Sequence, residues 1–270
     1  MELKDRYTFA DLVEIMQFLR SDSGCPWDRV QTHESLRANL LEEAYETVEA
    51  LEEGDPENLC EELGDLLLQV VFHAQIAADK GSFTLDEIIT KLCQKLISRH
   101  THLFGEDRAE TAEASLETWE KNKRKEKKIN SIAENFATVP KSFPALKRSQ
   151  KLQKRAADWN FDWSEPAPVF AKVDEELAEF KAAYVAGDQK NLEEEAGDVL
   201  MIFANLLRHL GIDAELALNL ANQKFLRRVS KMEELMSQDA IPKGPFPKDL
   251  TERYYKKVRA LEAKENQDKE

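Results

Sequence analysis

Length, composition and charge exclude several classes of protein. The chain has 270 residues, of which 42% are apolar, and it carries a formal net charge of −14. Such an acidic chain argues against binding long nucleic acid, and no apolar run approaches the roughly 18 residues that span a membrane. The three cysteines, Cys25, Cys60 and Cys93, form no CxxC pair, which favours reduced thiols and a cytoplasmic location.

The apolar residues recur with a period near 3.6 almost throughout the chain, which predicts an all-α fold. Asp55 before Pro56 is typical of a helix N-cap, and Thr84 with Glu87 of a capping box. In chain order, the predicted helices cover roughly residues 8–20, 34–53, 56–80, 84–100, 113–128, 142–158, 166–186, 189–210, 213–236 and 249–265.

A boundary near the middle of the chain predicts two tandem helical modules. The basic run 121–128 is followed by the stretch 129–140, where the helical pattern is interrupted. We therefore predict modules at 1–130 and 131–270, each close to the usual size of a single domain.

One acidic pattern occurs twice, at a constant offset of 133 residues. The first copy comprises Glu42, Glu43, Glu46, Glu61, Glu62, Gly64 and Asp65, and the second comprises Glu175, Glu176, Glu179, Glu194, Glu195, Gly197 and Asp198. Residues three or four apart share a helix face, so each copy predicts carboxylate pairs that converge from two consecutive antiparallel helices.

A solvated acidic face would explain one such run, but three features favour a ligand site. Glu195 lies on an apolar stripe that must face the core. Like charges four apart, such as Glu194 and Asp198, destabilise a helix by roughly 0.2–0.5 kcal/mol per pair. Gly64 and Gly197 lie inside helical segments, where glycine costs about 1 kcal/mol relative to alanine, and we expect a backbone or ligand to approach them closely.

Carboxylates without histidine or cysteine predict a site for a hard cation, Mg²⁺ or alternatively Mn²⁺. A di-iron site in a helical bundle would instead use a Glu-x-x-His motif. None of the five histidines follows a glutamate at that spacing, so a di-iron site is disfavoured.

Further motifs make the chain resemble the MazG family, within the superfamily of all-α nucleoside triphosphate pyrophosphohydrolases. The resemblance extends over essentially the whole chain. The motifs are EExxE followed by ExxD in both halves, GCPWD at 24–28, QTHESL at 31–36, RHxHxFG at 99–105, FDW at 161–163 and NxKFxxR at 222–228. In one departure, Trp159 and Asn160 stand where similar proteins tend to have a small residue and glycine.

The resemblance implies Mg²⁺-dependent hydrolysis of nucleoside triphosphates to monophosphate and pyrophosphate, with broad base tolerance. It also implies a homodimer of interlocking four-helix modules, in which the second module is catalytic. By this resemblance the metal ligands are Glu176, Glu179, Glu195 and Asp198, with an equivalent set of Glu43, Glu46, Glu62 and Asp65 in the first module. Because both sets are complete, ligand loss does not show which module is active.

Other residues would contact the substrate. We expect Glu175 to orient or deprotonate the attacking water, and Lys224 and Arg228 to hold the phosphates. Tyr255 stands near a position that often holds tryptophan in the family, so we expect it to stack on the base. The remaining substrate-binding candidates are Asn222, Arg259 and, at the corresponding spacing in the first module, Lys95 and Arg99.

Three functions therefore compete. The first is a hydrolase that removes non-canonical nucleotides or lowers the level of signalling nucleotides. The second is a regulator that binds nucleotide and metal without turnover, and the third is a helical scaffold. The intact acids favour the hydrolase, whereas the duplication leaves room for a regulatory first module.

Overall fold

The computed structural model describes residues 3–126, 129 and 131–267. Every regular element in these residues is a helix, so the all-α prediction is confirmed. The chain divides into two compact units, Met1–Lys128 and Ile129–Glu270, which we call the first and the second unit. Within the described residues, no helix is both long and apolar enough to cross a lipid bilayer.

Local signals in the sequence set the helix boundaries of the first unit. Asp55 accepts hydrogen bonds from two backbone amides at the start of the fourth helix, and Thr84 and Glu87 form the predicted capping box of the fifth. Gly54 ends the third helix in the left-handed conformation, with φ of 70°. The helices are α1 (Phe9–Arg20), α2 (Pro26–Val30), α3 (Arg37–Glu53), α4 (Pro56–Asp79), α5 (Leu85–Arg99), α6 (Thr101–Phe104) and α7 (Ala112–Glu126).

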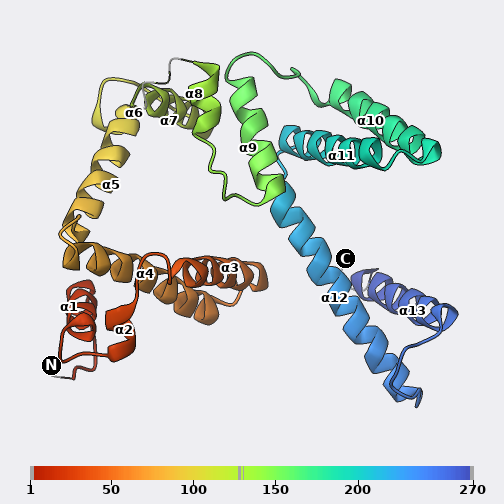
Figure 1. Cartoon of the computed structure of the whole chain (residues 1–270), viewed down its shortest axis with the longest axis horizontal. Helices are drawn as coiled ribbons and strands as arrows, with labels where there is room; N and C mark the ends of the chain where they lie inside the picture. The colour runs from red at the N-terminus through yellow and green to blue at the C-terminus, as the bar shows by residue number, and fades with distance from the viewer. Residues whose placement is uncertain (1–2, 127–128, 130, 268–270) are drawn as a thin grey trace. The chain divides into compact units, whose positions relative to one another are not determined.

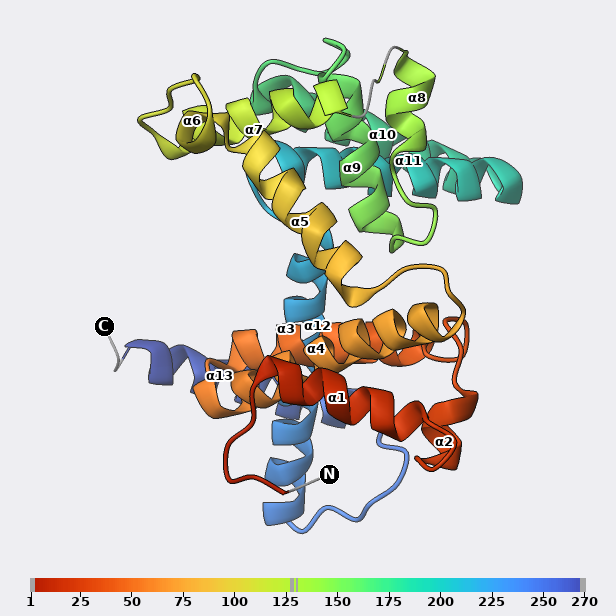
Figure 2. The ribbon, with the colours of Figure 1, turned by 90° about the vertical axis from the view of Figure 1, so that its left-hand side faces the viewer.

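An antiparallel hairpin of α3 and α4 forms the centre of the first unit, and α1 packs on α4 (Figures 1 and 2). The buried apolar core consists of Met16, Leu36, Val71, Phe72 and Ile76. Full burial of each such side chain contributes about 1.5–3 kcal/mol. The hairpin places the acidic segment of α3 beside that of α4.

The second unit repeats this hairpin and adds another. Gly187, with φ of 71°, ends one helix, and Asp188 caps the next, so the chain reverses between them. The helices are α8 (Ile132–Ala137), α9 (Ala145–Ala157), α10 (Pro166–Ala186), α11 (Gln189–His209), α12 (Ala214–Gln238) and α13 (Lys248–Gln267). Val169, Val173, Ile202 and Leu206 form the core between α10 and α11. A separate core of Leu235, Met236, Tyr254 and Val258 joins α13 to α12.

The ten predicted helices are confirmed to within a few residues at their described ends. The helix predicted over residues 113–128 corresponds to α7, and its predicted end at residue 128 lies outside the described residues. Three short helices, α2, α6 and α8, were not predicted, because four to six residues are too few to show a helical period. One of them, α8, occupies part of the predicted boundary stretch 129–140.

Candidate active site

The second acid cluster lies between α10 and α11. Glu176 and Glu179 project from α10 and Glu195 from α11, and one oxygen of each carboxylate lies within 4.8 Å of the others. Glu176 is 9% exposed, Glu195 is half-buried and Glu179 is exposed, so the cluster has one buried and one solvent-facing side. Asp198, the fourth predicted ligand, lies one turn along α11, half-buried and outside this set.

A lysine accompanies the second acid cluster. Lys172 Nζ lies 2.8 Å from Glu175 Oε1 and 2.8 Å from Glu176 Oε1, because the three residues are neighbours on one face of α10. Both hydrogen bonds raise the pKa of Lys172, and the bond to Glu175 has the larger effect. A permanent cation therefore offsets part of the cost of burying Glu176, and Glu175 faces that cation at the edge of the cluster.

The first acid cluster lies at the corresponding place between α3 and α4. It consists of Glu43 from α3 with Glu62 and Asp65 from α4, again with ligand oxygens within 4.8 Å of one another. Thr47 Oγ1 donates to the backbone carbonyl oxygen of Glu43 at 2.7 Å and also lies 3.4 Å from that of Glu62. Glu46 is exposed and lies outside the set.

Converging carboxylates perturb the electrostatics of both clusters. Partial desolvation, followed by repulsion from neighbouring acids, raises the pKa of Glu43, Glu62 and Glu195. Among the described residues, no lysine or arginine forms an ion pair with any acid of the first acid cluster. Asn39 stands at the position that matches Lys172. The first acid cluster therefore keeps more uncompensated negative charge.

Both clusters fit a hard divalent cation. Their ligand atoms are carboxylate oxygens that lie within 4.8 Å of one another, and repulsion between neighbouring acids contributes to the raised pKa of Glu43, Glu62 and Glu195. Hard cations prefer oxygen ligands and accept water or phosphate oxygens at the remaining positions. Residues that repel one another without a cation can thus bind one favourably.

The predicted phosphate and base contacts lie on other helices. Asn222, Lys224 and Arg228 belong to α12, and Tyr255 and Arg259 to α13. Arg228 forms an ion pair with Glu262 at 2.7 Å, and the ring of Tyr255 packs near that of Phe225. Asn222, Lys224 and Arg259 are exposed. No contact joins α10 to α12 or α13 anywhere in the described part of the chain. One chain by itself therefore does not bring these residues to the second acid cluster.

The corresponding pair in the first unit differs in its surroundings. Lys95 is exposed on α5, but Arg99 is 8% exposed. The Arg99 guanidinium lies 2.8 Å from Glu126 and 5.2 Å from the ring centroid of Trp119. We infer that Arg99 joins α5 to α7, a structural role that differs from the predicted phosphate contact.

The two helical glycines bear on the backbone part of one expectation, and the approach of a ligand stays a prediction. A Cβ atom added to Gly64 or Gly197 would meet no atom within 4 Å. The close approach of a backbone that we predicted is therefore absent from the single chain. The glycines instead leave open surface beside each cluster.

Comparison with known proteins identifies the family. Over 254 residues the chain is 44% identical to the nucleoside triphosphate pyrophosphohydrolase/pyrophosphatase MazG of Thermotoga maritima, which covers 93% of this chain and 95% of that protein. The chain belongs to the MazG family. A family member from Escherichia coli, a nucleoside triphosphate pyrophosphohydrolase, is 40% identical over 254 residues, covering 93% of this chain and 97% of its own length.

The two units of this MazG-family chain match different domain descriptions. Residues 31–104 match the MazG nucleotide pyrophosphohydrolase domain, and residues 149–224 match phosphoribosyl-ATP pyrophosphohydrolase. Each match includes one acid cluster. The chain is also 37% identical over 236 residues to the uncharacterized protein YabN of Bacillus subtilis. This match covers 87% of the chain and 48% of YabN.

Sequence reasoning missed Lys172 at this site. The signal was present, because Lys172 precedes Glu175 by three residues and Glu176 by four, the spacing of helical ion pairs.

The sequence analysis also treated Asn160 as a departure from glycine. Asn160 has φ of 57°, a left-handed conformation that favours glycine and that asparagine tolerates better than most residues.

Proposed function

We propose that the chain is a Mg²⁺-dependent nucleoside triphosphate pyrophosphohydrolase whose second acid cluster is the catalytic site. Water attacks the α-phosphorus, the bond between that phosphorus and the bridging oxygen breaks, and nucleoside monophosphate and pyrophosphate are released. The observation that carries this proposal is the convergence of Glu176, Glu179 and Glu195 beside Lys172. Carboxylates that bind a cation, next to a lysine that can bind phosphate, suit phosphoryl transfer.

The residues divide the chemistry among them. Glu176, Glu179 and Glu195 would hold the cation, with Asp198 one turn away. The bound ion supplies neutralisation of phosphate charge and a lowered pKa for water. Lys172 can exchange its contact with Glu176 for a phosphate oxygen, because its ammonium needs only an anionic partner. Glu175 then loses its cation and can accept the proton of the attacking water.

Several surfaces support a homodimer. Large apolar side chains are exposed on the helices of the second unit: Phe170, Tyr184, Phe203, Phe225 and Leu226. Such faces are usually covered in a soluble protein. A second copy of the chain that packs on α10 and α11 would bury Phe170, Tyr184 and Phe203. It would also bring the α12–α13 hairpin, with its substrate-binding candidates, to the second acid cluster.

Substrate range, location and role extend the proposal. We expect broad tolerance of the base and Mg²⁺ as the physiological ion, with Mn²⁺ as a substitute. Three free cysteines and the acidic charge favour the cytoplasm. There the enzyme would remove non-canonical nucleotides or lower the level of signalling nucleotides.

The first unit suits binding better than turnover. Its cluster has the acids for a cation, but Asn39 replaces the lysine that accompanies the second acid cluster. Asparagine brings no charge to a phosphate. We therefore assign the first acid cluster to metal or nucleotide binding that regulates the second unit.

Paired substitutions test the assignment. Glu195→Gln in the second acid cluster should abolish hydrolysis of nucleoside triphosphates in Mg²⁺, whereas the matched Glu62→Gln in the first should leave most of it. EDTA should abolish the wild-type activity. Size-exclusion chromatography of each variant checks that dimerisation is unaffected. Equal loss from both variants would refute the assignment to the second unit.

A further inference from the structure

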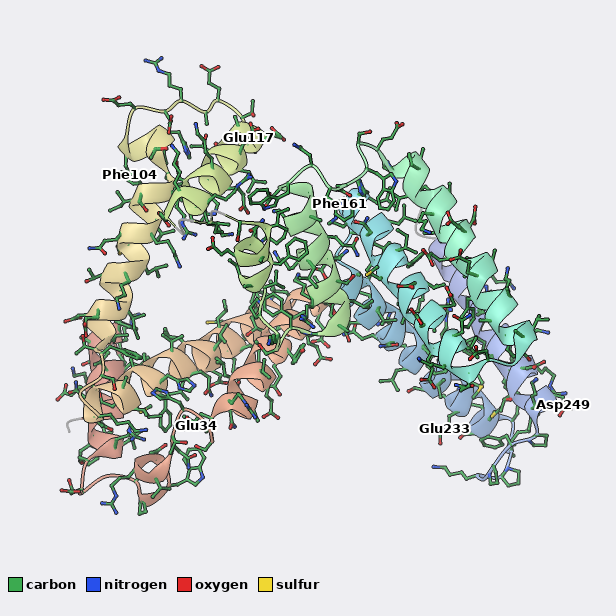
Figure 3. All side chains as sticks on the ribbon, turned by 45° about the horizontal axis from the view of Figure 1, so that its top comes forward. Glu34, Phe104, Glu117, Phe161, Glu233 and Asp249 are labelled. Atoms are coloured by element: carbon green, nitrogen blue, oxygen red, sulfur yellow. The ribbon has the colours of Figure 1, made fainter. Side chains whose placement is uncertain are left out.

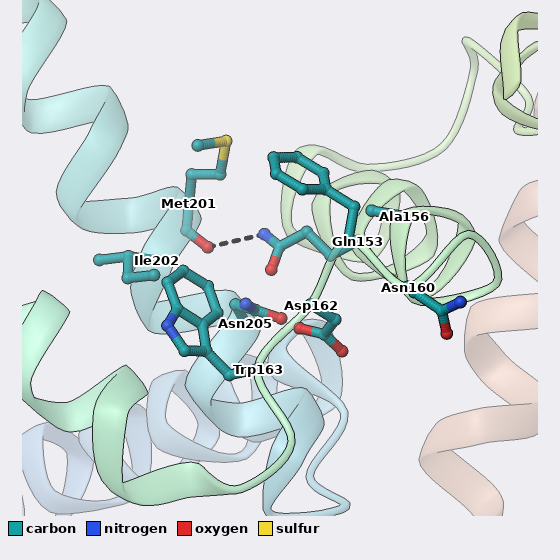
Figure 4. Close-up of a pocket in the computed structure, with 9 residues that line it drawn as sticks. Gln153, Ala156, Asn160, Asp162, Trp163, Met201, Ile202 and Asn205 are labelled. Carbon is teal, nitrogen blue, oxygen red and sulfur yellow. Dashed lines mark hydrogen bonds between the residues drawn. The ribbon is translucent and has the colours of Figure 1, made fainter.

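Two cavities of the second unit lie where α9 packs on α11, and no residue lines both. The larger, of about 500 Å³, has a mainly apolar lining that includes Phe161, labelled in Figure 3, and Met201, labelled in Figure 4. The smaller, of about 250 Å³, lies between α9, the end of α11 and the start of α12. We call it the basic pocket, and its lining includes Lys147, Gln150, Lys151, Lys154, Arg208 and Asp213.

The helix α9 gives the basic pocket most of its charge. Between residues 145 and 157 this helix has five basic side chains and no acidic one, in a chain whose net charge is −14. Lys147, Lys151 and Lys154 follow one another at intervals of four and three residues, so they lie on one face of α9. Like charges at this spacing destabilise a helix. An anion bound beside them would offset that repulsion.

Arg208 adds a fixed cation to the basic pocket. Its Nε donates to Asn205 Oδ1 at 2.9 Å and its Nη2 donates to Asp162 Oδ2 at 2.5 Å, and both partners are labelled in Figure 4. Within the described part of the chain, Nη1 forms no hydrogen bond. A guanidinium held through two of its nitrogens keeps its orientation, and the third nitrogen has two N–H donors that suit a phosphate oxygen.

A buried glutamine joins the three helices around the basic pocket. Gln150, which is 8% exposed, donates from Nε2 to the carbonyl oxygens of Ala204 and Ile212, at 3.1 and 2.9 Å. Its Oε1 accepts from the Ala214 amide at 3.1 Å. These bonds connect α9 to α11 and to the first residue of α12. The basic pocket is therefore preformed.

The carboxylate that lines the basic pocket already has its own partners. Asp213 accepts from Lys147 Nζ and, as the N-cap of α12, from the backbone amides of Glu215 and Leu216. The Glu215 carboxylate accepts from the Lys147 amide and lies outside the lining. Among the described residues that line the pocket, four cations thus face one carboxylate, which leaves an excess of positive charge.

The first unit shows that the packing does not require these cations. At the offset of 133 residues, Gln150 corresponds to Gln17 of α1, which lines a cavity of about 520 Å³ between α1, α4 and α5. The positions of the four cations are occupied there by Glu14, Phe18, Ser21 and Gln75. Because α1 packs on α4 as α9 packs on α11, the same arrangement of helices forms without a cation at any of these positions.

We propose that the basic pocket binds a phosphate-rich anion of the diphosphate or triphosphate class without a metal ion. Lysine and arginine side chains supply the charge that a metal ion would otherwise bring to the phosphate oxygens. Arg208 and Glu195 are thirteen residues apart on α11, or about 20 Å, so the basic pocket is separate from the second acid cluster of the same chain. Pyrophosphate, the product of the proposed reaction, belongs to this class, and only this link to hydrolysis rests on the proposed function.

A charge variant and its control test the role of the lysines. Lys151→Gln combined with Lys154→Gln removes two cations from the basic pocket. Lys243→Gln combined with Lys248→Gln removes the same charge from exposed positions that do not line it. Circular dichroism and size-exclusion chromatography check the fold and the oligomeric state of each variant.

A steric variant closes the basic pocket and keeps its charge. Ile212 lines the pocket and is 42% exposed, so Ile212→Trp narrows the mouth without changing a buried group. Leu210→Trp is the matched control, because Leu210 is exposed nearby in the chain and does not line the pocket.

Calorimetry in EDTA measures the binding of inorganic pyrophosphate and of ATP, since EDTA prevents binding through a metal at the acid clusters. The wild type should bind both, more weakly as the ionic strength rises. Both pocket variants should raise both Kd values about tenfold or more, and both controls should leave them unchanged. Failure of the wild type to bind pyrophosphate, binding of ATP alone, or equal losses in pocket and control variants would overturn the proposal. Because no hydrolysis is measured, these results are independent of the proposed function.

Discussion

Replacement of Arg99 by methionine tests whether this arginine stabilises the first unit or binds substrate. Its guanidinium makes a charged hydrogen bond to Glu126 at 2.8 Å and lies 5.2 Å from the Trp119 ring centroid. A charged hydrogen bond contributes roughly 1.5–3 kcal/mol and a cation–π contact roughly 0.5–2 kcal/mol. Methionine keeps the apolar stem, and Glu126 is one-third exposed, so water can solvate it. We therefore expect Arg99→Met to lower the free energy of unfolding by about 2 kcal/mol.

Urea unfolding followed by tryptophan fluorescence measures this effect, since Trp119 lies at the altered contact. With a slope of about 2 kcal/mol per molar urea, the midpoint should fall by about 1 M. Lys95→Met, at an exposed position of the same helix, is the control and should leave the midpoint unchanged. The KM for nucleoside triphosphates should stay the same in Arg99→Met. An unchanged midpoint together with a tenfold higher KM would refute the structural role and restore the phosphate contact.

The remaining predictions concern the second acid cluster. Glu195→Gln should stabilise the metal-free protein at neutral pH, because it removes a carboxylate whose folded pKa is raised above its unfolded value. This advantage should shrink as the pH falls through the raised pKa, since protonation removes the same charge from the wild type. Thermal unfolding in EDTA between about pH 4 and pH 8 measures it, and an advantage that grows on acidification contradicts the argument. Lys172→Met should bind Mg²⁺ severalfold more tightly without nucleotide, because Lys172 occupies a Glu176 oxygen, yet hydrolyse more slowly. Calorimetry in a Glu62→Gln background isolates this cluster, and an unchanged Mg²⁺ affinity would count against competition by the lysine.

Much of the fold could be predicted from local sequence. Long helices such as α4 and α11 repeat their apolar period over several turns, and caps such as Asp55 and Gly187 mark where they begin and end. Short helices such as α2 lack that signal. What local sequence does not encode is which helices pack together. The separation of α12 and α13 from α10 therefore became evident only in the structure.

The candidate site was predicted in part for the same reason. The duplicated acids follow from spacing alone, and the structure places Glu176, Glu179 and Glu195 within reach of one cation. The basic pocket of the same unit depends on residues from α9, α11 and the turn before α12, which no single helical period relates. Its clearest signal in the sequence was the contrast between its four cations and the residues at matching positions of the repeat, none of which is basic. That contrast acquires meaning only when the four cations are known to line one pocket.

The most direct test of the central claim is to follow which product takes up oxygen from water. A nucleoside triphosphate is hydrolysed in water labelled with heavy oxygen, with Mg²⁺ and then with EDTA, and the products are separated and analysed by phosphorus NMR. Attack at the α-phosphorus predicts label in the nucleoside monophosphate, unlabelled pyrophosphate, and no reaction in EDTA or in Glu195→Gln. Label in pyrophosphate, release of orthophosphate, or full activity in EDTA would contradict the assignment of this reaction to the second acid cluster.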